Sequence, residues 1–270
     1  MKIELDLSKN LAQNADEFFQ KSKKAKRKIE GLQKALNDSE KKFSSFSEKT
    51  VQVEKETKEK LLKKRKKAWF EKFHWCFSSE NRLILAGRDA GSNEELVKNY
   101  MKPGDVYFHP EFQGSPHCII KTEKNFATTE EKIEASILVA SFSKAWEAKI
   151  SSLDVYSVLP EQVSKKAPQG ESMGKGAFMI YGKREWFKKT PLHLAIGVKK
   201  DGEELIVVSG PESAVKKHAL FFVRIIQGNT EKNIASKQLK KLFEQKLKVV
   251  GIDLDEILSM LPPGGVKLVE

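Results

Sequence analysis

An uninterrupted heptad pattern of apolar and small residues near the start of the chain most strongly constrains its fold. Its positions advance by alternating steps of four and three residues: Leu11, Ala15, Phe18, Ser22, Ala25, Ile29, Leu32, Leu36, Ser39, Phe43, Phe46, Thr50 and Val53. This spacing is typical of the contact face of a coiled-coil helix. We predict one continuous helix over residues 11–67, on the order of 85 Å long, with Ser8 as its N-cap.

Such a helix needs a partner, because its apolar seam would otherwise face water. A turn at Ser44-Ser45 would fold the helix back on itself, but the heptad register runs through these serines. We therefore expect another chain, or a second copy of this one, to cover the seam. Residues 1–10 alternate between apolar and charged side chains, which fits either a short strand or an extended lead-in.

The positive charge is concentrated on the same segment. Residues 21–67 hold 18 Lys and Arg against 7 Asp and Glu, which accounts for +11 of the chain's formal net charge of +12. The run of five basic residues at 63–67 suits the end of a helix dipole, but the dipole alone does not require five. A basic stripe of this kind favours a polyanion such as RNA or an anionic membrane. The alternative is a solvated, lysine-rich helix face.

From Ala68 onward, short apolar runs alternate with turns, which predicts an α+β fold with a mixed, largely antiparallel sheet and flanking helices. We predict strands at 73–77, 82–87, 106–108, 118–120, 155–158, 178–181, 192–198, 205–208 and 220–226, with an Asp201-Gly202 hairpin turn. Helices are predicted at 92–101, 128–149, 211–219, 229–247 and 254–260. The first two open on the capping boxes Ser92-x-x-Glu95 and Thr128-x-x-Glu131. Ile133, Ile137, Ala140 and Trp146 are expected to point inward.

The loop between two predicted strands at 103–121 gathers polar residues. It presents His109, Gln113, Gly114, Ser115 and His117, and polar groups on loops between fixed strands are typical of binding sites. The histidines and Cys118 do not match a zinc spacing, so we predict no metal. Cys118 and Cys76 each lie in an apolar run, which predicts buried thiols in a reducing cytosol rather than nucleophiles. Structural histidines, or histidines that contact RNA bases, are the interpretations we favour.

Two further sets of cations fit contact with nucleic acid. Lysines alternate with Trp186 and Phe187 on what we predict to be loops, and a mixture of this kind supplies both phosphate contact and base stacking. The lysines are Lys165, Lys166, Lys175, Lys183, Lys188 and Lys189. Arg88, next to Asp89 in a glycine loop, suits bidentate contact with a phosphate or base. The alternatives are a solvated loop whose aromatic residues fold into the core, and an internal Arg88–Asp89 ion pair.

Several motifs, in order, resemble the NFACT family of ribosome quality-control factors. They are Gly87-Arg88-Asp89, Asn93-Glu94, Asp105-x-Tyr107-x-His109, Gln113-Gly114-Ser115, Val163-Ser164-Lys165-x-Ala167-Pro168-x-Gly170-Glu171 and Gly176-x-Phe178-Met179-Ile180-x-Gly182-Lys183. Near the start, Leu5-Asp6-Leu7-Ser8, Asn14-Ala15 and Phe18-Phe19 resemble the family's coiled-coil segment. We accordingly expect a coiled-coil segment at 1–67, an NFACT-like RNA-binding domain at 68–228 and a C-terminal helical extension at 229–270.

The resemblance implies a cytoplasmic, non-enzymatic protein that needs no cofactor and contacts no membrane. It would bind stalled large ribosomal subunits with peptidyl-tRNA, through rRNA and tRNA, and help to recruit tRNA for untemplated C-terminal tailing of the nascent chain. In this family the coiled coil pairs with an upstream helix, so the expected partner is a missing N-terminal NFACT half or a second coiled-coil copy. The residues expected to contact RNA are Arg88, Asn93, His109, Gln113, Gly114, Ser115, His117, Lys121, Ser164, Lys165, Lys166, Lys175 and Lys183.

Two other classes of function stay open at this stage. One is an enzyme that uses His109 and His117, which would turn over a small substrate. The other is a coiled-coil scaffold whose globular part is a protein-docking module, which would bind no RNA.

Overall fold

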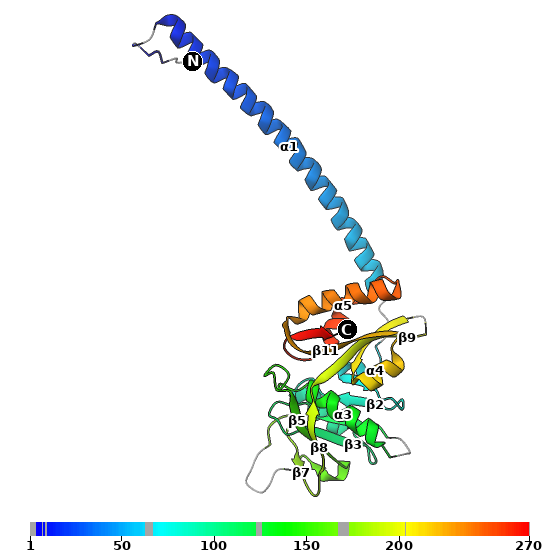
Figure 1. The fold of residues 1–270 in the computed structure, drawn as a ribbon. Coiled ribbons are helices and arrows are strands. Elements are labelled where there is room, and N and C mark those ends of the chain that lie inside the picture. Colours follow the sequence, from blue (N-terminus) through cyan, green and yellow to red (C-terminus); the bar gives the residue numbers. More distant parts are fainter. Residues whose placement is uncertain are drawn as a thin grey trace. The chain divides into compact units, whose positions relative to one another are not determined.

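The chain forms two compact units, residues 1–67 and residues 68–270 (Figure 1). The description rests on a computed structural model and covers residues 4–6, 8, 10–62, 67–122, 126–166, 173–202 and 204–269, with the backbone alone for residues 41–62. The predicted basic run at 63–67 therefore lies, except for Lys67, outside the described residues.

The first unit is the continuous helix α1 (Leu11–Leu62), which confirms the prediction that no turn interrupts it at Ser44-Ser45. The N-cap is Asn10 rather than Ser8: the Asn10 side chain accepts the Gln13 N–H at 2.8 Å, and the Gln13 side chain accepts the Asn10 N–H at 3.0 Å. Ser8 instead donates its N–H to Asp6 Oδ1 at 3.0 Å. Asn10 directly precedes the helix and caps its first turn. Ser8 therefore belongs to the segment before the helix.

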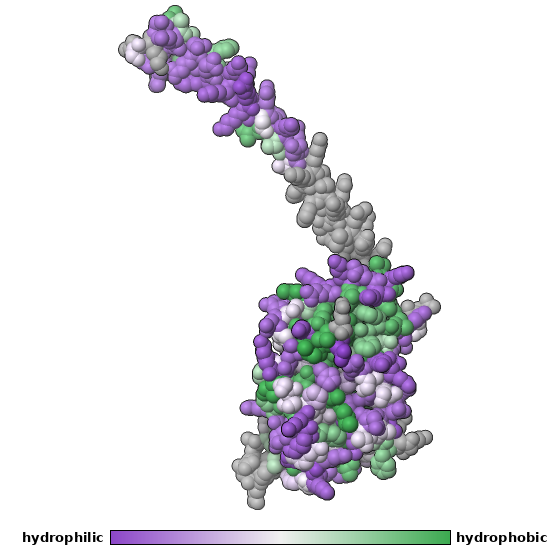
Figure 2. All heavy atoms as spheres, in the orientation of Figure 1, coloured by the Kyte–Doolittle hydropathy of each residue, from purple (hydrophilic) through white to green (hydrophobic). Residues whose placement is uncertain are grey.

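The apolar seam of α1 is exposed over the part whose side chains are described. Leu11, Phe18, Ile29, Leu32 and Leu36 are between 41% and 80% exposed. Figure 2 shows hydrophilic side chains over most of the visible face here, with apolar side chains reaching the surface among them. The exposed apolar residues thus keep the heptad spacing of a coiled-coil contact face, and the expected partner stays a prediction.

The second unit is built around two antiparallel sheets, in agreement with the predicted α+β fold. The larger sheet has the strand order β1-β2-β4-β3-β5-β8. Its strands are β1 (His74–Phe77), β2 (Leu83–Ala86), β3 (Val106–Pro110), β4 (Cys118–Ile120), β5 (Ser152–Val158) and β8 (Glu185–Pro191). Strand β8 was not predicted, because its sequence holds two lysines and a glutamate and so reads as a loop.

The smaller sheet has the strand order β10-β9-β11-β12. It consists of β9 (His193–Asp201), β10 (Glu204–Gly210), β11 (Phe221–Thr230) and β12 (Val266–Val269). The hairpin between β9 and β10 confirms the predicted Asp201-Gly202 turn. Strand β12 was also missed; it pairs with β11, so residues after 229 add to this sheet as well as forming helices. A separate two-stranded sheet pairs β6 (Val163–Ser164) with β7 (Met179–Ile180).

The second unit also contains helices. They are η1 (Trp69–Lys72), α2 (Ala90–Glu95), η2 (Leu96–Tyr100), α3 (Thr129–Ser141), η3 (Pro160–Gln162), α4 (Glu212–His218), α5 (Lys232–Leu247) and α6 (Leu254–Met260). Helix α3 packs on one face of the larger sheet, against β3, β4, β5 and β8, while α5 packs against β11 and β12 of the smaller sheet. Figure 1 shows α3 beside β3 and β5 and α5 beside β11.

Two helix predictions need correction. The cap of α2 is Asp89, whose side chain accepts the Ser92 N–H at 2.8 Å, so the helix starts before Ser92. The Thr128–Glu131 capping box of α3 is confirmed, but this helix ends at Ser141 rather than near Lys149. Ile133 is 45% exposed and does not point inward, although Ala140 and Trp146 are buried.

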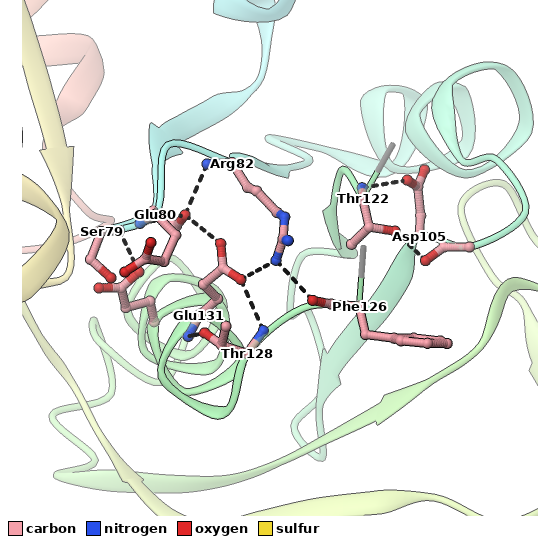
Figure 3. A network of polar contacts seen from close by, with 11 residues as sticks. Ser79, Glu80, Arg82, Asp105, Thr122, Phe126, Thr128 and Glu131 are labelled. Atoms are coloured by element: carbon pink, nitrogen blue, oxygen red, sulfur yellow. Dashed lines mark hydrogen bonds and ion pairs between the residues drawn. The ribbon is translucent and has the colours of Figure 1, made fainter. Parts of the chain in front are cut away.

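The reason for the Ile133 error is a buried polar network on the inner face of α3 (Figure 3). Glu131 is fully buried; it accepts a hydrogen bond from Ser78 Oγ at 2.7 Å and forms an ion pair with Arg82. Glu134 accepts the Ser79 N–H at 2.9 Å. These two carboxylates bind the β1–β2 turn to α3. Glu131 and Glu134 therefore face the protein interior, and Ile133, which hydrophobic periodicity predicts to be buried, faces solvent.

Candidate nucleic-acid interface

Asn93 ties the end of β2 to the start of β4. Its buried Oδ1 accepts the His117 N–H at 3.0 Å, and the Gly87 N–H donates to the His117 carbonyl, also at 3.0 Å. A Cβ on Gly87 would lie 1.9 Å from this Oδ1, so a side chain at that position cannot coexist with the Asn93 contact. Asn93 therefore has a clear structural role, and its expected RNA contact stays a prediction.

Arg88 joins three segments of the domain through its side chain. Its guanidinium donates to the Ser259 carbonyl at 3.1 Å and to the Phe73 carbonyl at 3.0 Å. Asp89 caps α2 instead of pairing with Arg88. Two of the guanidinium nitrogens thus donate hydrogen bonds inside the protein. Arg88 therefore has fewer N–H donors free for the bidentate RNA contact predicted from the sequence.

Lys121 is likewise engaged inside the domain. Its Nζ donates to the Tyr100 carbonyl at 2.8 Å and forms an ion pair with Asp105. Asp105 is buried and also accepts the N–H groups of Lys102 at 2.8 Å and of Thr122 at 3.0 Å. Asp105, the first residue of the Asp105-x-Tyr107-x-His109 motif, therefore stabilises the turn before β3.

Lys165 and Glu94 hold the chain at Gly174 and Gly176, shortly before β7. The Lys165 Nζ donates to the Glu94 carboxylate at 3.2 Å and to the Gly174 carbonyl at 2.9 Å. Glu94 also accepts the Gly176 N–H at 2.9 Å. Hydrogen bonds from Lys98, the Gly176 backbone and Lys165 lower the pKa of Glu94 to about 2, so this carboxylate stays ionised at neutral pH.

His109 lies on β3 rather than on the predicted loop, because the strand runs on to Pro110. It lies beside His117, and both histidines are neutral at pH 7. Their ring centroids are 4.8 Å apart, and His117 Nδ1 is hydrogen-bonded to the Tyr107 hydroxyl. Burial lowers the pKa of His109 to about 4 and that of His117 to about 3. An uncharged ring suits a base better than a phosphate. His117 is buried and His109 is half-buried, so His117 has a packing role here and its expected RNA contact stays a prediction.

The other predicted residues divide into exposed and engaged positions. The exposed residues are Gln113, Gly114, Lys166, Lys175 and Lys183. Gly114 has φ +77°, in the left-handed region that favours glycine. Ser115 is buried, and its Oγ has no hydrogen-bond partner among the described residues. Ser164 Oγ accepts the Lys166 N–H at 3.1 Å, which orients the chain leading to Lys166.

A column of rings crosses three neighbouring strands on the face of the larger sheet opposite α3. His109 on β3 is paired in register with Tyr156 on β5, and Tyr156 is paired with Trp186 on β8. The ring centroids are 6.0 Å apart for His109–Tyr156 and 5.4 Å apart for Tyr156–Trp186. We call His109, Tyr156 and Trp186 the aromatic ladder.

Two cations lie on the aromatic ladder. The Arg184 guanidinium is 4.5 Å from the Tyr156 ring centroid and 5.9 Å from that of Trp186. Lys188 Nζ is 4.1 Å from the Trp186 centroid and 2.8 Å from Asp154 Oδ2. Among the described residues, no carboxylate is within ion-pair distance of Arg184. Sequence reasoning missed Tyr156 and Arg184 because only strand pairing brings them beside His109.

The ladder lies at the less covered end of its sheet face. Farther along the same face, Phe70 of η1 packs on Trp75 at 5.0 Å between centroids, and Phe178 packs on His117 at 5.3 Å. Trp186 is only partly buried, and the ring and cation contacts found for it come from Tyr156, Arg184 and Lys188. Tyr156 is buried, so the β5–β8 end presents the Trp186 ring and positive charge together.

The family model of the NFACT protein RNA-binding domain matches residues 72–182 of this chain. The archaeal Rqc2 homolog aRqcH of Methanocaldococcus jannaschii is 37% identical over 213 residues, covering 79% of this chain and 31% of that protein. The ribosome quality control complex subunit NEMF of Homo sapiens is 38% identical over 187 residues, covering 68% of this chain and 17% of that protein. The chain belongs to the NFACT family. It spans less than a third of the length of either relative.

The NFACT match places part of the aromatic ladder inside the RNA-binding domain. His109 and Tyr156 lie within residues 72–182, and Arg184 and Trp186 follow directly on β8 and its approach. The exposed lysines Lys166 and Lys175 also fall in the matched range. Both the ring column and these cations are thus carried by, or adjoin, the NFACT RNA-binding domain.

Other kinds of site find little support in the described part of the chain. There, no group of three or more His, Cys, Asp or Glu side chains is arranged to hold a metal ion. Burial raises the pKa of the Cys76 and Cys118 thiols, so neither is a thiolate at neutral pH. None of the helices in the described ranges is long and apolar enough to span a membrane.

Proposed function

We propose that this chain is a non-catalytic, RNA-binding factor of ribosome quality control that acts on stalled large ribosomal subunits. The observation that carries the proposal is the NFACT RNA-binding domain at residues 72–182. Relatives named as ribosome quality control complex subunits, in Drosophila melanogaster and Homo sapiens, support the process. The partners are rRNA of the subunit and tRNA, and the chain helps to recruit tRNA for untemplated tailing of a nascent chain still held as peptidyl-tRNA.

The geometry supports binding rather than catalysis. His109 and His117 are neutral and packed among rings, and both thiols are buried and protonated. Exposed Lys166, Lys175 and Lys183 supply positive charge around the second unit, and α1 supplies a basic helix. Phosphate contacts of this kind weaken steeply with salt, because each one releases condensed counterions.

A coiled-coil scaffold without RNA binding is the second candidate, favoured by the exposed seam of α1. The two functions differ in what they bind in a lysate. A scaffold would carry protein through its seam, show little salt dependence and bring down no RNA.

The test is sedimentation of the tagged chain through sucrose gradients of cell lysate at low and high salt, with sequencing of the RNA that co-purifies. We expect the chain to travel with large ribosomal subunits at low salt, to leave them at high salt and to carry rRNA and tRNA. A variant with Lys166, Lys175 and Lys183 changed to Glu should stay near the top of the gradient.

The matched control changes the same number of exposed lysines elsewhere in the second unit, namely Lys200, Lys216 and Lys217 to Glu. This variant has the same net charge and should still sediment with the subunits. Wild-type chain that remains at the top at both salt concentrations, without RNA, would favour the scaffold.

A further inference from the structure

The aromatic ladder combines three properties in one place. Its rings are held in register by strand pairing, from β3 through β5 to β8. Arg184 and Lys188 lie over the ring faces at 4.5 Å and 4.1 Å. Its outermost ring, Trp186, is on the edge strand of the sheet and is partly exposed. Tyr156 is buried, with Arg184 over its ring. The sheet therefore offers a ligand the partly exposed Trp186 ring, with the two cations beside it.

We propose that the aromatic ladder is a stacking site for unpaired RNA bases, with Arg184 and Lys188 contacting the adjoining phosphates. The inference rests on the proposed RNA-binding function and names the form of RNA that the site takes. Every base has a π face, so stacking on Trp186 tolerates any sequence. The guanidinium plane of Arg184 extends the stacking surface beyond Tyr156, since bases also stack on arginine.

Charge complementarity favours a polyanion as the occupant. Arg184 lacks a carboxylate partner among the described residues, and Lys188 is shared between Asp154 and the Trp186 ring. Lys183 is exposed immediately before Arg184 in the chain. A phosphodiester next to a stacked base would meet these cations, whereas an apolar peptide would leave their charge uncompensated.

The sheet geometry selects unpaired rather than base-paired RNA. Bases in an A-form duplex are stacked on one another, and side chains cannot enter its deep, narrow major groove to reach their faces. Rings fixed on strands cannot extend far from the sheet, so a base must come out of the helix to lie on Trp186. Loops, bulges and single strands meet this requirement.

Tryptophan fluorescence tests the contact directly. The chain has four tryptophans; Trp75 and Trp146 are at most 2% exposed, while Trp69 is 49% exposed in the same unit. In full-length chain carrying Trp69→Phe, Trp186 is thus the accessible tryptophan. Titration with an unpaired octamer of uridine should quench the emission. Adding Trp186→Phe should abolish the quenching.

Affinity measured by fluorescence anisotropy tests whether the ring matters for binding. We expect Trp186→Leu to weaken binding of the single-stranded octamer about tenfold and binding of a duplex of equal length less than twofold. Trp186→Phe keeps a ring on the strand and should restore most of the affinity. Trp69→Leu, which removes an exposed tryptophan away from the ladder, is the matched control and should bind like wild type.

Each outcome has a defined meaning. Unchanged octamer affinity in Trp186→Leu overturns the ladder proposal, and so does an equal loss for octamer and duplex. Recovery in Trp186→Phe excludes misfolding as the cause of a loss in Trp186→Leu and supports the proposal. If the wild-type chain sediments with ribosomal subunits but Trp186→Leu leaves octamer binding unchanged, the ladder proposal alone fails. If wild type binds neither subunits nor RNA, the proposed function fails with it.

Discussion

Asn93 lies where the end of β2 meets the start of β4, and its side-chain Oδ1 accepts the His117 N–H. Replacing it by Ala would leave the buried His117 N–H unpaired. We expect Asn93→Ala to lower the free energy of unfolding by about 1–3 kcal/mol, measured by urea denaturation. Gln113→Ala, at an exposed site on the loop that leads to His117, should change it by less than about 0.5 kcal/mol. Normal stability with lost RNA affinity would instead make Asn93 a contact residue.

The two neutral histidines predict a loss of stability in mild acid. Burial chiefly lowers the pKa of His117 to about 3 and that of His109 to about 4, while an unfolded histidine titrates near 6.5. Between these values the unfolded state binds more protons, so stability falls as the pH is lowered from about 6.5 to 4. His117→Gln removes one such group.

From pH 7 to pH 5 this variant should therefore lose about 2 kcal/mol less stability than wild type. The measurement is the free energy of unfolding in urea at both pH values. Parallel pH profiles for the two proteins would contradict the buried, neutral state of His117.

Single residues were predictable from the sequence when their partners lie nearby in the chain. The Thr128–Glu131 capping box spans three residues and could be read directly. Arg88 could not, because its carbonyl partners belong to Phe73 and Ser259, and the latter is 171 residues away. An engaged arginine and an RNA-contacting arginine look the same in sequence, since both are polar residues in a glycine loop.

At the scale of elements, periodicity succeeded for α1 and failed for β8. The heptad of α1 repeats many times, whereas β8 has one short alternation in which Glu185 and Lys188 meet charges on other elements. Glu185 pairs with Lys132 of α3 at 2.8 Å, and Lys188 pairs with Asp154 of β5, also at 2.8 Å. A strand whose charged residues pair with distant elements does not show the alternation of apolar and polar residues that identifies a strand. The aromatic ladder depends on β8, so it could not be predicted from the sequence.

The exposed seam of α1 predicts association. Purified chain at tens of micromolar should sediment faster than a 30.6 kDa monomer, because a second copy covers the seam. Changing Leu32 and Leu36 to Glu should shift it toward monomer in analytical ultracentrifugation. The control changes Lys24 and Lys28, exposed residues off the seam, to Glu. A monomer at every concentration would contradict self-association through the seam.

At the scale of the whole molecule, the charge is divided unevenly between the two units. Residues 21–67 carry a net +11, whereas residues 68–270 hold 29 Lys and Arg against 26 Asp and Glu, a net +3. We therefore expect residues 21–67 to supply most of the long-range attraction to RNA, and the second unit to supply cations placed beside rings. This division could be foreseen from the sequence, because counting charges needs no tertiary contacts.

Salt dependence should reveal this division. The logarithm of affinity falls linearly with the logarithm of salt concentration, by about 0.7 per phosphate contacted on a single strand. Changing Lys23, Lys24, Lys26 and Lys28 to Gln keeps helix propensity while removing four exposed charges from α1. We expect the slope for binding large ribosomal subunits between 50 and 300 mM salt, roughly the range over which such contacts are lost, to become shallower by about 3 if all four lysines contact phosphates. Trp186→Leu should lower the affinity with the slope unchanged, because stacking displaces no counterions. If instead the lysine-to-glutamine variant keeps the wild-type slope, the helix lysines are solvated and the attraction must come from the second unit.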